Sequence, residues 1–385
     1  MKKSIAMLLA LVLMLSMTSA LAEITTVDAA TARSVLRAPA AENPVEDGVS
    51  PTTGLTLAEL DAPDGFAGLA VTGRYMPMLI QIDNFEGGLD NRAPWDASYA
   101  DIIYETPLYQ SGETRLSMLF SDLIPEYVGP ARSARVNHVW IREEWDAAFC
   151  FWGGQKYEGT SIDEQFRVLG ARDKGILFDG TAGGKAWNPY CGHTEKLANP
   201  HDAYYMLAAL STQVVPASHT APNHAYRFTD LAPAGGDEAE VIYVKWGNPP
   251  YNSILEYDTE EQVYYRYMSA DDVATENELY TEIAPVPSKN DPIVHKEAIT
   301  FSNVIVQFMN CEYPRTDAPL PTVTGSGNAD YFMGGQHFQG VWGRDTLQDR
   351  TVFYDMNGQE IELQRGHTLI IMMDYQSRGR GISYE

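Results

Sequence analysis

One stretch of the sequence, Gly129–Arg135, constrains the fold around it most strongly. The Gly129-Pro130 pair is predicted to end the apolar strand before it, because proline has no amide proton to give to a strand. Ser133 is a good N-cap for the helix that the following apolar periodicity predicts. We therefore expect this loop to turn a strand into a helix and to place Arg132 and Arg135 at the start of that helix.

Two interpretations of the arginine pair follow from this placement. Free backbone N–H groups at a helix start, with Arg132 and Arg135 beside them, would bind a phosphate or a carboxylate. Alternatively, both arginines pair with carboxylates of the protein itself and brace the loop. The sequence leaves both interpretations open.

The first 22 residues have the pattern of a signal peptide. Lys2-Lys3 forms a positive start, Ile5–Met17 is an apolar run too short to span a membrane comfortably, and Ala20-Leu21-Ala22 is a small-x-small cleavage site. We expect cleavage near Ala22 and an extracytoplasmic protein, secreted or associated with the cell surface, that has no membrane span after cleavage. An uncleaved signal anchor is the alternative.

The next segments predict a flexible linker and a first folded domain. Residues 23–70 are rich in Ala, Pro, Thr, Asp and Glu with little periodicity, which is typical of a flexible linker, although Pro51–Leu55 is a candidate ordered patch. Residues 71–211 alternate short apolar strands with helical segments, including a helix that Ser161 opens with capping-box spacing. This alternation predicts a mixed α/β sandwich.

The second half of the chain has a different character. After a linker at residues 212–224, residues 225–374 hold many short runs of β-branched and aromatic residues, with hairpin signals at Gly334-Gly335 and Asn357-Gly358. These features predict a mostly antiparallel β domain, and residues 375–385 read as a loose tail. The expected fold class is α+β, with an N-terminal α/β sandwich followed by this β-rich domain.

Charge and cysteine content limit the classes of partner. The formal net charge of −25 repels nucleic acid and anionic lipid, so we expect no nucleic-acid partner. The three cysteines, Cys150, Cys191 and Cys311, lie far from the cleavage site, which excludes lipid attachment to a cysteine there. They are too few for a disulfide scaffold, and a Cys150–Cys191 bridge is one alternative.

An ordered series of motifs resembles the YerB-like family of bacterial exported proteins. The resemblance extends over nearly the whole mature chain and both predicted domains. It implies an extracytoplasmic, envelope-associated role, but the activity of the family is not established, so it supplies no catalytic residues. Many members resemble lipoproteins with an N-terminal cysteine, which this sequence lacks. The motifs are Asp83-Asn84, Ala100–Glu105, Thr114-Arg115, Gly129–Arg135, Gly153-Gly154, Asn199–Tyr204, Glu256–Asp258, Tyr265-Arg266, Asn303–Val306 and Gly340–Trp342.

Polar side chains at the ends of these elements form the candidate ligand-binding site, because an α/β layout gathers element ends. The candidates are Asp83, Asn84, Glu105, Arg115, Arg132, Ser133, Arg135 and His201. Buried ion pairs that only fix the strand ends are the competing explanation for the carboxylates.

The sequence favours binding over catalysis. We expect an envelope-associated binding or scaffold protein for an anionic envelope component, such as a cell-wall or anionic glycan ligand, or for an envelope protein partner. The alternative is a hydrolase or transferase that acts on a phosphorylated or glycan polymer, with Arg132 and Arg135 holding the anion and Glu105 or His201 carrying the proton. The nucleophile elbow, the zinc-protease motif, the P-loop and the dinucleotide fingerprint are missing from the sequence, so we expect no metal and no cofactor.

Overall fold

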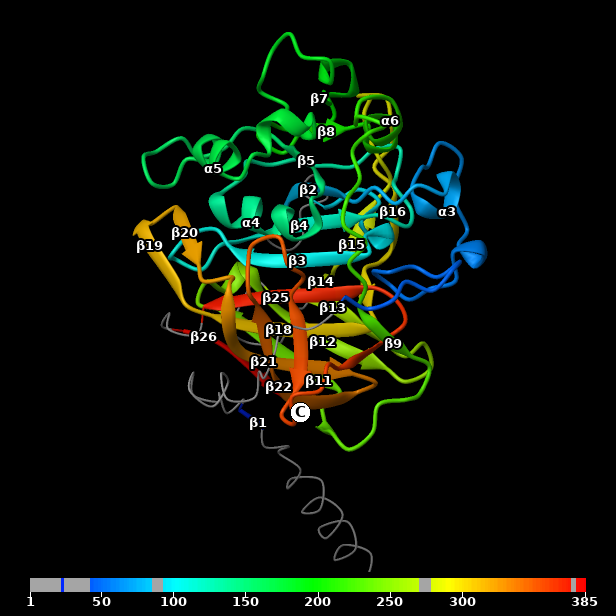
Figure 1. Ribbon diagram of the computed structural model, residues 1–385, viewed down its shortest axis with the longest axis vertical. Helices are drawn as coiled ribbons and strands as arrows, with labels where there is room; N and C mark the ends of the chain where they lie inside the picture. Colours follow the sequence, from blue (N-terminus) through cyan, green and yellow to red (C-terminus); the bar gives the residue numbers. More distant parts are fainter. Residues whose placement is uncertain (1–21, 24–41, 85–92, 270–277, 375–378) are drawn as a thin grey trace, which may run out of the picture.

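The computed structural model describes residues 22–23, 42–84, 93–269, 278–374 and 379–385, and within them most of the regular structure is β. The largest element is an 11-stranded sheet in the order β10-β22-β21-β18-β25-β3-β4-β2-β5-β6, with β23 paired to β22. Figure 1 shows β2 and β5 at one end of this sheet and β22 near the other. Its strands are β2 (Met78–Asp83), β3 (Ile102–Pro107), β4 (Thr114–Phe120), β5 (Ala148–Phe151), β6 (Leu177–Asp179), β10 (Asp237–Glu238), β18 (Asn303–Met309), β21 (Gly325–Met333), β22 (Gln336–Arg344), β23 (Val352–Asp355) and β25 (Thr368–Asp374).

A second sheet of seven strands packs on one face of the large sheet. Six of its strands follow the order β1-β26-β11-β12-β13-β14, and β17 pairs with β13 off this path. All of these strand pairs are antiparallel. Its strands are β1 (Ala22–Glu23), β11 (Val241–Trp246), β12 (Asn252–Asp258), β13 (Val263–Ser269), β14 (Glu278–Leu279), β17 (Thr300–Phe301) and β26 (Arg380–Tyr384).

The large sheet combines both halves of the sequence. Strand β25 pairs in parallel with β18 on one side and with β3 on the other, and Thr368 lies opposite Ile102 in the second pairing. The two segments that the sequence predicts as separate domains, residues 71–211 and 225–374, therefore contribute strands to one continuous sheet.

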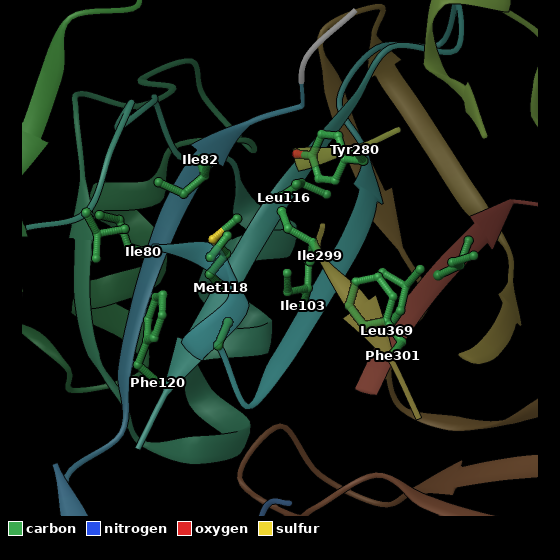
Figure 2. Close-up of a cluster of buried hydrophobic side chains, with 14 of the residues drawn as sticks. Ile80, Ile82, Ile103, Leu116, Met118, Phe120, Tyr280, Ile299, Phe301 and Leu369 are labelled. Carbon is green, nitrogen blue, oxygen red and sulfur yellow. The ribbon is translucent and has the colours of Figure 1, made fainter. Parts of the chain in front are cut away.

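Alternation along the strands creates two distinct cores. On β2 and β4, Ile82 and Leu116 belong to the core that the second sheet covers, and Figure 2 shows Leu116 beside Tyr280, the residue that follows β14 of that sheet. Leu79 and Leu119 face the other way, toward the helix α4 (Val136–Trp145). Consecutive residues of these strands thus lie in different environments, and this separation also determines where the polar residues at the strand ends point.

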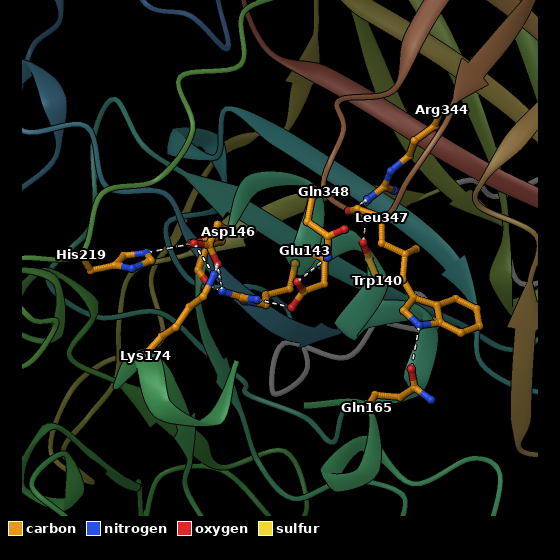
Figure 3. A network of polar contacts seen from close by, with 11 residues as sticks. Trp140, Glu143, Asp146, Gln165, Lys174, His219, Arg344, Leu347 and Gln348 are labelled. Carbon is orange, nitrogen blue, oxygen red and sulfur yellow. Dashed lines mark hydrogen bonds and ion pairs between the residues drawn. The ribbon is translucent and has the colours of Figure 1, made fainter. Parts of the chain in front are cut away.

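Helix α4 is fixed on its face of the sheet by a network of polar contacts near its C-terminal end (Figure 3). Arg142 pairs with Glu143 and with Asp146, and Lys174 donates to Asp146 at 2.7 Å. From the β-rich half of the chain, Arg344 donates to the carbonyl of Trp140 at 3.0 Å. Residues from both halves of the sequence therefore hold α4, and the first residue of this helix directly follows the Gly129–Arg135 loop.

The described residues 42–70 pack on the folded body, where the sequence predicts a flexible linker. The Thr52 hydroxyl donates to the Asp101 carboxylate at 2.6 Å, and the Thr53 hydroxyl donates to Asp122 at 2.7 Å. All four side chains are buried. The composition of this segment resembles that of a linker because residues with small hydroxyl side chains show no hydrophobic periodicity. In the structure these hydroxyl groups donate hydrogen bonds to buried carboxyl groups. Pro51–Leu55, the candidate ordered patch, is part of this contact.

Residues 380–384 form a strand, where the sequence predicts a loose tail. Strand β26 pairs with β11, so that Ile382 lies opposite Val244, and Ile382 and Tyr384 are buried. The Gly334-Gly335 hairpin is confirmed, because both glycines have positive φ and join β21 to β22. At Asn357-Gly358 the chain also turns back on itself, because Tyr354 and Glu360 form an antiparallel bridge and the amide of Asp355 donates to the carbonyl of Gln359 at 2.8 Å. The next strand, β24 (Glu362–Gln364), then pairs in parallel with β9 (Arg227–Thr229).

The remaining elements are short. The helix that Ser161 was predicted to open is present as α5, and the Ser161 hydroxyl accepts the amide proton of Glu164. After Asp202 the chain forms the strand Ala203–Tyr205, which pairs with a neighbouring strand, and then α6. These elements are α3 (Leu69–Thr72), α5 (Ile162–Val168), α6 (Leu207–Gln213), the strand pairs β7 (Cys191–His193) with β8 (Ala203–Tyr205), β15 (Thr281–Ile283) with β16 (His295–Ala298) and β19 (Cys311–Arg315) with β20 (Ala318–Pro321), and 3-10 turns at 57–59, 97–99, 172–174, 188–190 and 249–251.

The predicted signal peptide lies outside the described residues except for Ala22. Among the residues that the structure does describe, no helix is long and apolar enough to cross a membrane. Cys150, Cys191 and Cys311 are all free thiols, so a Cys150–Cys191 bridge is not formed in this structure.

Candidate functional site

The end of β2 lies beside the start of the antiparallel strand β4, and the two strands direct one charged residue each to the same face of the sheet. Asp83 is the cross-strand partner of Arg115 in the antiparallel register. Because Ile82 and Leu116 point into the core between the sheets, Asp83 and Arg115 point to the opposite face, toward the start of α4. Both side chains are buried, so the fold brings a carboxylate and a guanidinium together out of solvent.

The Gly129–Arg135 loop crosses these strand ends and is held by its backbone. The amide of Ala131 donates to the carbonyl of Ala203 at 2.7 Å, and the amide of Arg132 donates to the carbonyl of Gln81 at 2.9 Å. Gly129 is packed so closely that an added Cβ would lie 3.0 Å from the carbonyl oxygen of Ala203. The arginine side chains therefore extend from a backbone with little freedom to move.

The helix start differs from the sequence prediction. Helix α4 begins at Val136, and its N-cap is Arg135, whose amide donates to Nδ1 of His138 at 3.0 Å. Ser133 is therefore not the N-cap. The amides of Ala131, Arg132 and Arg135 all donate hydrogen bonds within the protein. Their acceptors are two backbone carbonyls of neighbouring strands and the His138 ring. These three amides are therefore not available to an anion at this loop, whereas the arginine side chains are close to it.

Ser133 lies at the centre of the arginine cluster, which we define as Arg115, Arg132 and Arg135. The Ser133 hydroxyl oxygen accepts from Nη1 of Arg115 at 3.1 Å and from Nη1 of Arg135 at 3.0 Å. Arg115 also donates to the carbonyl of Ser133, and Nε of Arg135 donates to the carbonyl of Asp317 at 3.0 Å. Two guanidinium groups thus meet at one neutral oxygen atom.

Arg132 and His201 form the outer edge of the cluster. His201 Nδ1 lies 2.6 Å from Oδ2 of Asp83, and Nε of Arg132 lies 3.7 Å from Oδ1 of the same carboxylate. Nη1 of Arg132 also donates to the carbonyl of Pro200 at 2.6 Å. The Arg132 and His201 side chains are 20% and 18% exposed, so they are the members that solvent reaches most readily among these contacts.

The cluster holds more positive than negative charge. Among the described residues, one ion pair joins a carboxylate to the cluster, that of Asp83 with Arg132, and the Asp317 carboxylate acts on Arg135 from farther away. The pKa of Arg115 is lowered to about 9, chiefly by burial; Asp83 opposes the shift, whereas Arg135 and Arg132 add to it. Burial also lowers the pKa of Arg135. A second anion at this position would restore the balance and favour the charged guanidinium groups.

Two of the predicted candidates lie on the other face of the sheet. Asn84 and Thr114 both donate to Glu105 Oε1, at 3.0 and 2.8 Å, and Glu105 Oε2 pairs with Nη2 of Arg266 at 2.9 Å. Arg266 also stacks over the ring of Tyr280 at 4.6 Å, in the region between the sheets that Figure 2 shows. Burial raises the pKa of Glu105, and Arg266 opposes this shift most strongly.

The structure therefore divides the eight candidates. It brings together Asp83, Arg115, Arg132, Ser133, Arg135 and His201, and it places Asn84 and Glu105 in a separate buried group beyond the sheet. Glu105 has no contact with the arginine cluster among the interactions of the described residues. Its neighbours instead tie β3 to the second sheet.

Sequence reasoning missed three residues that complete these groups. His138 caps the helix start, and burial with Arg115 and Arg135 holds its pKa well below the usual range, which keeps the ring neutral. Its three-residue spacing from Arg135 was the available signal. Asp317 and Arg266 are distant from the loop in sequence. No local pattern marks Asp317, and the Tyr265-Arg266 motif does not indicate that Arg266 pairs with Glu105.

We also searched the described residues for side chains that could together bind a metal ion. No group of three or more His, Cys, Asp or Glu side chains among them is arranged to hold a metal ion. The site chemistry that the described residues offer is thus electrostatic and hydrogen-bonding, with His201 as a group that can exchange a proton.

Comparison with known proteins identifies similar chains in both halves. Residues 66–220 match the family model "Protein of unknown function (DUF3048) N-terminal domain", and residues 242–370 match the model of the C-terminal domain of the same family. The Bacillus subtilis (strain 168) protein described as "Putative lipoprotein YerB" is 26% identical over 184 residues, which is 46% of this chain and 51% of that protein. This match therefore spans about half the length of the relative.

A solved structure has the same fold. The crystal structure of YerB protein from Bacillus subtilis superposes with a TM-score of 0.60 and 17% sequence identity, and the match covers 87% of this chain and 99% of the other. The arginine cluster lies entirely within the segment that matches the N-terminal model, and Arg266 lies in the segment that matches the C-terminal one.

Proposed function

We propose that this chain, which belongs to the DUF3048 family of proteins of unknown function through both its N-terminal and its C-terminal domain, is an exported binding protein that holds an anionic group of an envelope component in its arginine cluster. The group is a phosphate or a carboxylate, because these are the anions that guanidinium groups hold in bidentate geometry. A cell-wall or other anionic glycan is the class of component that carries such groups.

The observation that carries this proposal is the charge imbalance of the buried cluster. Arg115 and Arg135 meet at Ser133, and Arg132 lies beside Asp83, the one carboxylate that forms an ion pair with the cluster among the described residues. Burying positive charge with few negative partners is costly, so this excess of cations among the described residues favours an external anion. Since the protein as a whole has a net charge of −25, the cluster is a local exception.

Export is the second part of the proposal. Residues 1–22 have the signal-peptide pattern, and the similar Bacillus protein is described as "Putative lipoprotein YerB". A secreted or cell-surface location places the arginine cluster among envelope polymers. A protein partner that presents a phosphate or carboxylate would use the same cluster.

A hydrolase or transferase activity on such a polymer is the second candidate function. It is favoured by one contact, the 2.6 Å approach of His201 Nδ1 to Asp83, because a carboxylate at Nδ1 orients a histidine for proton transfer through Nε2. His201 would carry the proton in this case. Glu105, which lies across the sheet, is too enclosed to take that role.

The proposal is tested by titrating the mature protein with inorganic phosphate and with succinate in a calorimeter. Arg132→Gln is the variant of choice, because the Arg132 side chain is partly exposed and its loss should leave the fold intact. We expect binding of at least one of the two anions and a loss of about tenfold or more in affinity in the variant. Preference for one anion identifies the class of the envelope ligand.

Arg172→Gln is the matched control, since Arg172 is an exposed arginine whose ion pair with Asp163 spans 3.7 Å. It removes the same charge at a distance from the cluster and should bind as the wild type does. Equal affinities of both variants, or the absence of binding of either anion by the wild type, would refute the proposed function.

A further inference from the structure

A hollow of about 430 Å³ lies at the opposite end of the large sheet from the arginine cluster. It is formed where β10, β22 and the turn after β23 meet the last strand, β26. Its walls include the carboxylates of Asp237 and Asp355 and the rings of His337, Phe338 and Tyr384. Its size is that of sites that bind small organic molecules.

The aromatic wall of the hollow is built from packed rings. The rings of His337 and Tyr384 lie 4.4 Å apart at an angle of 32°, and Phe332 packs against both of them at 5.0 and 5.7 Å. His337 Nε2 is held at 2.6 Å by the buried carboxylate of Asp330. These contacts fix the ring orientations, so the wall is formed before any ligand arrives.

Asp237 carries the charge of the hollow. Its Oδ2 atom lies 3.4 Å from the Tyr384 hydroxyl, and no lysine, arginine or histidine of the described residues forms an ion pair with it. Asp355 is also without such a cation, although its carboxylate accepts the amides of Asn357 and Gln359 in the turn. The hollow therefore repels anions, in contrast to the arginine cluster.

Together these features define the ligand. We propose that the hollow binds an organic ammonium group, the primary amine of a small molecule or of an amino sugar, with Asp237 as its counter-charge and the ring of Tyr384 or Phe338 beside it. A carboxylate next to aromatic rings attracts a cation both by direct pairing and through the negative faces of the rings. A metal ion fits less well, because no metal-binding group of three such side chains is found in the described part of the chain.

The experiment titrates the full mature protein with glucosamine and with glucose, which differ at one position by an ammonium in place of a hydroxyl. We expect glucosamine to bind with a dissociation constant of about 10 mM or tighter, and glucose to bind at least about tenfold more weakly. Equal binding of the two sugars, or no binding of glucosamine, would overturn the proposal.

Variants locate the ammonium group. Asp237→Asn keeps the size of the side chain and should weaken glucosamine binding about tenfold, the loss of one charge-assisted contact. Glu238→Gln removes the same charge from the next residue, which is exposed and does not line the hollow, and it should have no effect. If the two variants weaken binding equally, a general charge effect explains the result and the site is refuted.

This site is independent of the arginine cluster. Arg132→Gln should therefore bind glucosamine as the wild type does, even though it loses anion binding. The two proposals can thus fail separately.

Discussion

Glu105 on β3 and Arg266 on β13 form a fully buried ion pair that joins the two sheets, with 2.9 Å between Oε2 and Nη2. The pair links a residue of the N-terminal half to one of the β-rich half. Among the described residues, Glu105 is the carboxylate that pairs with Arg266, and the ring of Tyr280 lies over the guanidinium group at 4.6 Å, so Glu105 is the main compensation for the buried cation.

Replacing Glu105 by glutamine should destabilise the protein by about 3–5 kcal/mol, because it leaves the Arg266 charge unpaired in the interior. The free energy of unfolding in urea measures this loss. Glu256→Gln, at an exposed position of the neighbouring strand β12, is the control and should change stability by less than about 0.5 kcal/mol. Similar unfolding midpoints for the two variants would show that the pair does not hold the sheets together.

Thr52→Val should loosen the N-terminal segment. The substitution removes the 2.6 Å hydrogen bond to the buried Asp101 carboxyl group and should cost about 0.5–1.5 kcal/mol, as expected for one hydrogen bond; burial and the neighbouring Asp122 raise the pKa of Asp101 well above its usual range. Thermal unfolding gives the stability, and limited proteolysis shows whether cleavage within residues 42–60 becomes faster. Thr56→Val is the control, since Thr56 is exposed and its side chain makes no capping bond. Equal protease resistance of the two variants would contradict the contact.

Ser133→Ala tests the centre of the arginine cluster. The variant loses the oxygen that accepts from Arg115 and Arg135, and we expect a destabilisation of about 1–3 kcal/mol in phosphate-free buffer. Added phosphate can replace the lost acceptor, so it should raise the melting temperature of this variant more than that of the wild type. Ser218→Ala, an exposed serine, should respond to phosphate as the wild type does. A smaller response of Ser133→Ala than of the wild type would place the anion elsewhere.

Glu282 should give the stability of the protein a dependence on pH. The pKa of Glu282 is raised from 4.5 to about 7, chiefly by burial, although hydrogen bonds from Ser98 oppose the shift. The folded state thus binds this proton more tightly than the unfolded state. The resulting stabilisation is complete below about pH 4.5 and is lost as the pH rises through about 7.

The difference amounts to roughly 3 kcal/mol, at 1.36 kcal/mol per pKa unit. We expect Glu282→Gln to lose less stability than the wild type between pH 5 and pH 8, as measured by urea unfolding at each pH. Glu297→Gln, an exposed glutamate on β16, should keep the wild-type dependence. Parallel pH profiles of the wild type and Glu282→Gln would contradict the shifted pKa.

The candidate site was predictable in part. Runs of apolar residues indicate the strand that ends at Asp83 and the strand that begins beside Arg115. The order of the motifs indicates the Gly129–Arg135 loop. Successive side chains of a strand point to opposite faces of the sheet, so Asp83 and Asn84 must face opposite ways. Their assignment to two different groups of residues therefore follows from the sequence once β2 is recognised. The position of Asp317 beside Arg135 does not, because it depends on a contact between residues 182 positions apart.

The continuity of the large sheet was not predictable from local patterns. Buried parallel strands such as β25 are continuous apolar runs in the sequence, and such a run does not indicate which strands it will pair with. The pairing of β25 with β3 joins segments separated by most of the chain. The last strand, β26, was read as a tail because its residues, Arg380–Tyr384, include glycine and polar side chains, yet its register with β11 buries Ile382 and Tyr384.

The place of β25 between β18 and β3 has a consequence for biosynthesis. A growing polypeptide contains β3 long before β25 has been made, so the edge of β3 that β25 will cover stays open while the residues between the two strands are synthesised. Open strand edges invite pairing with other chains. The nascent N-terminal half therefore needs either delay or protection until β25 has left the ribosome.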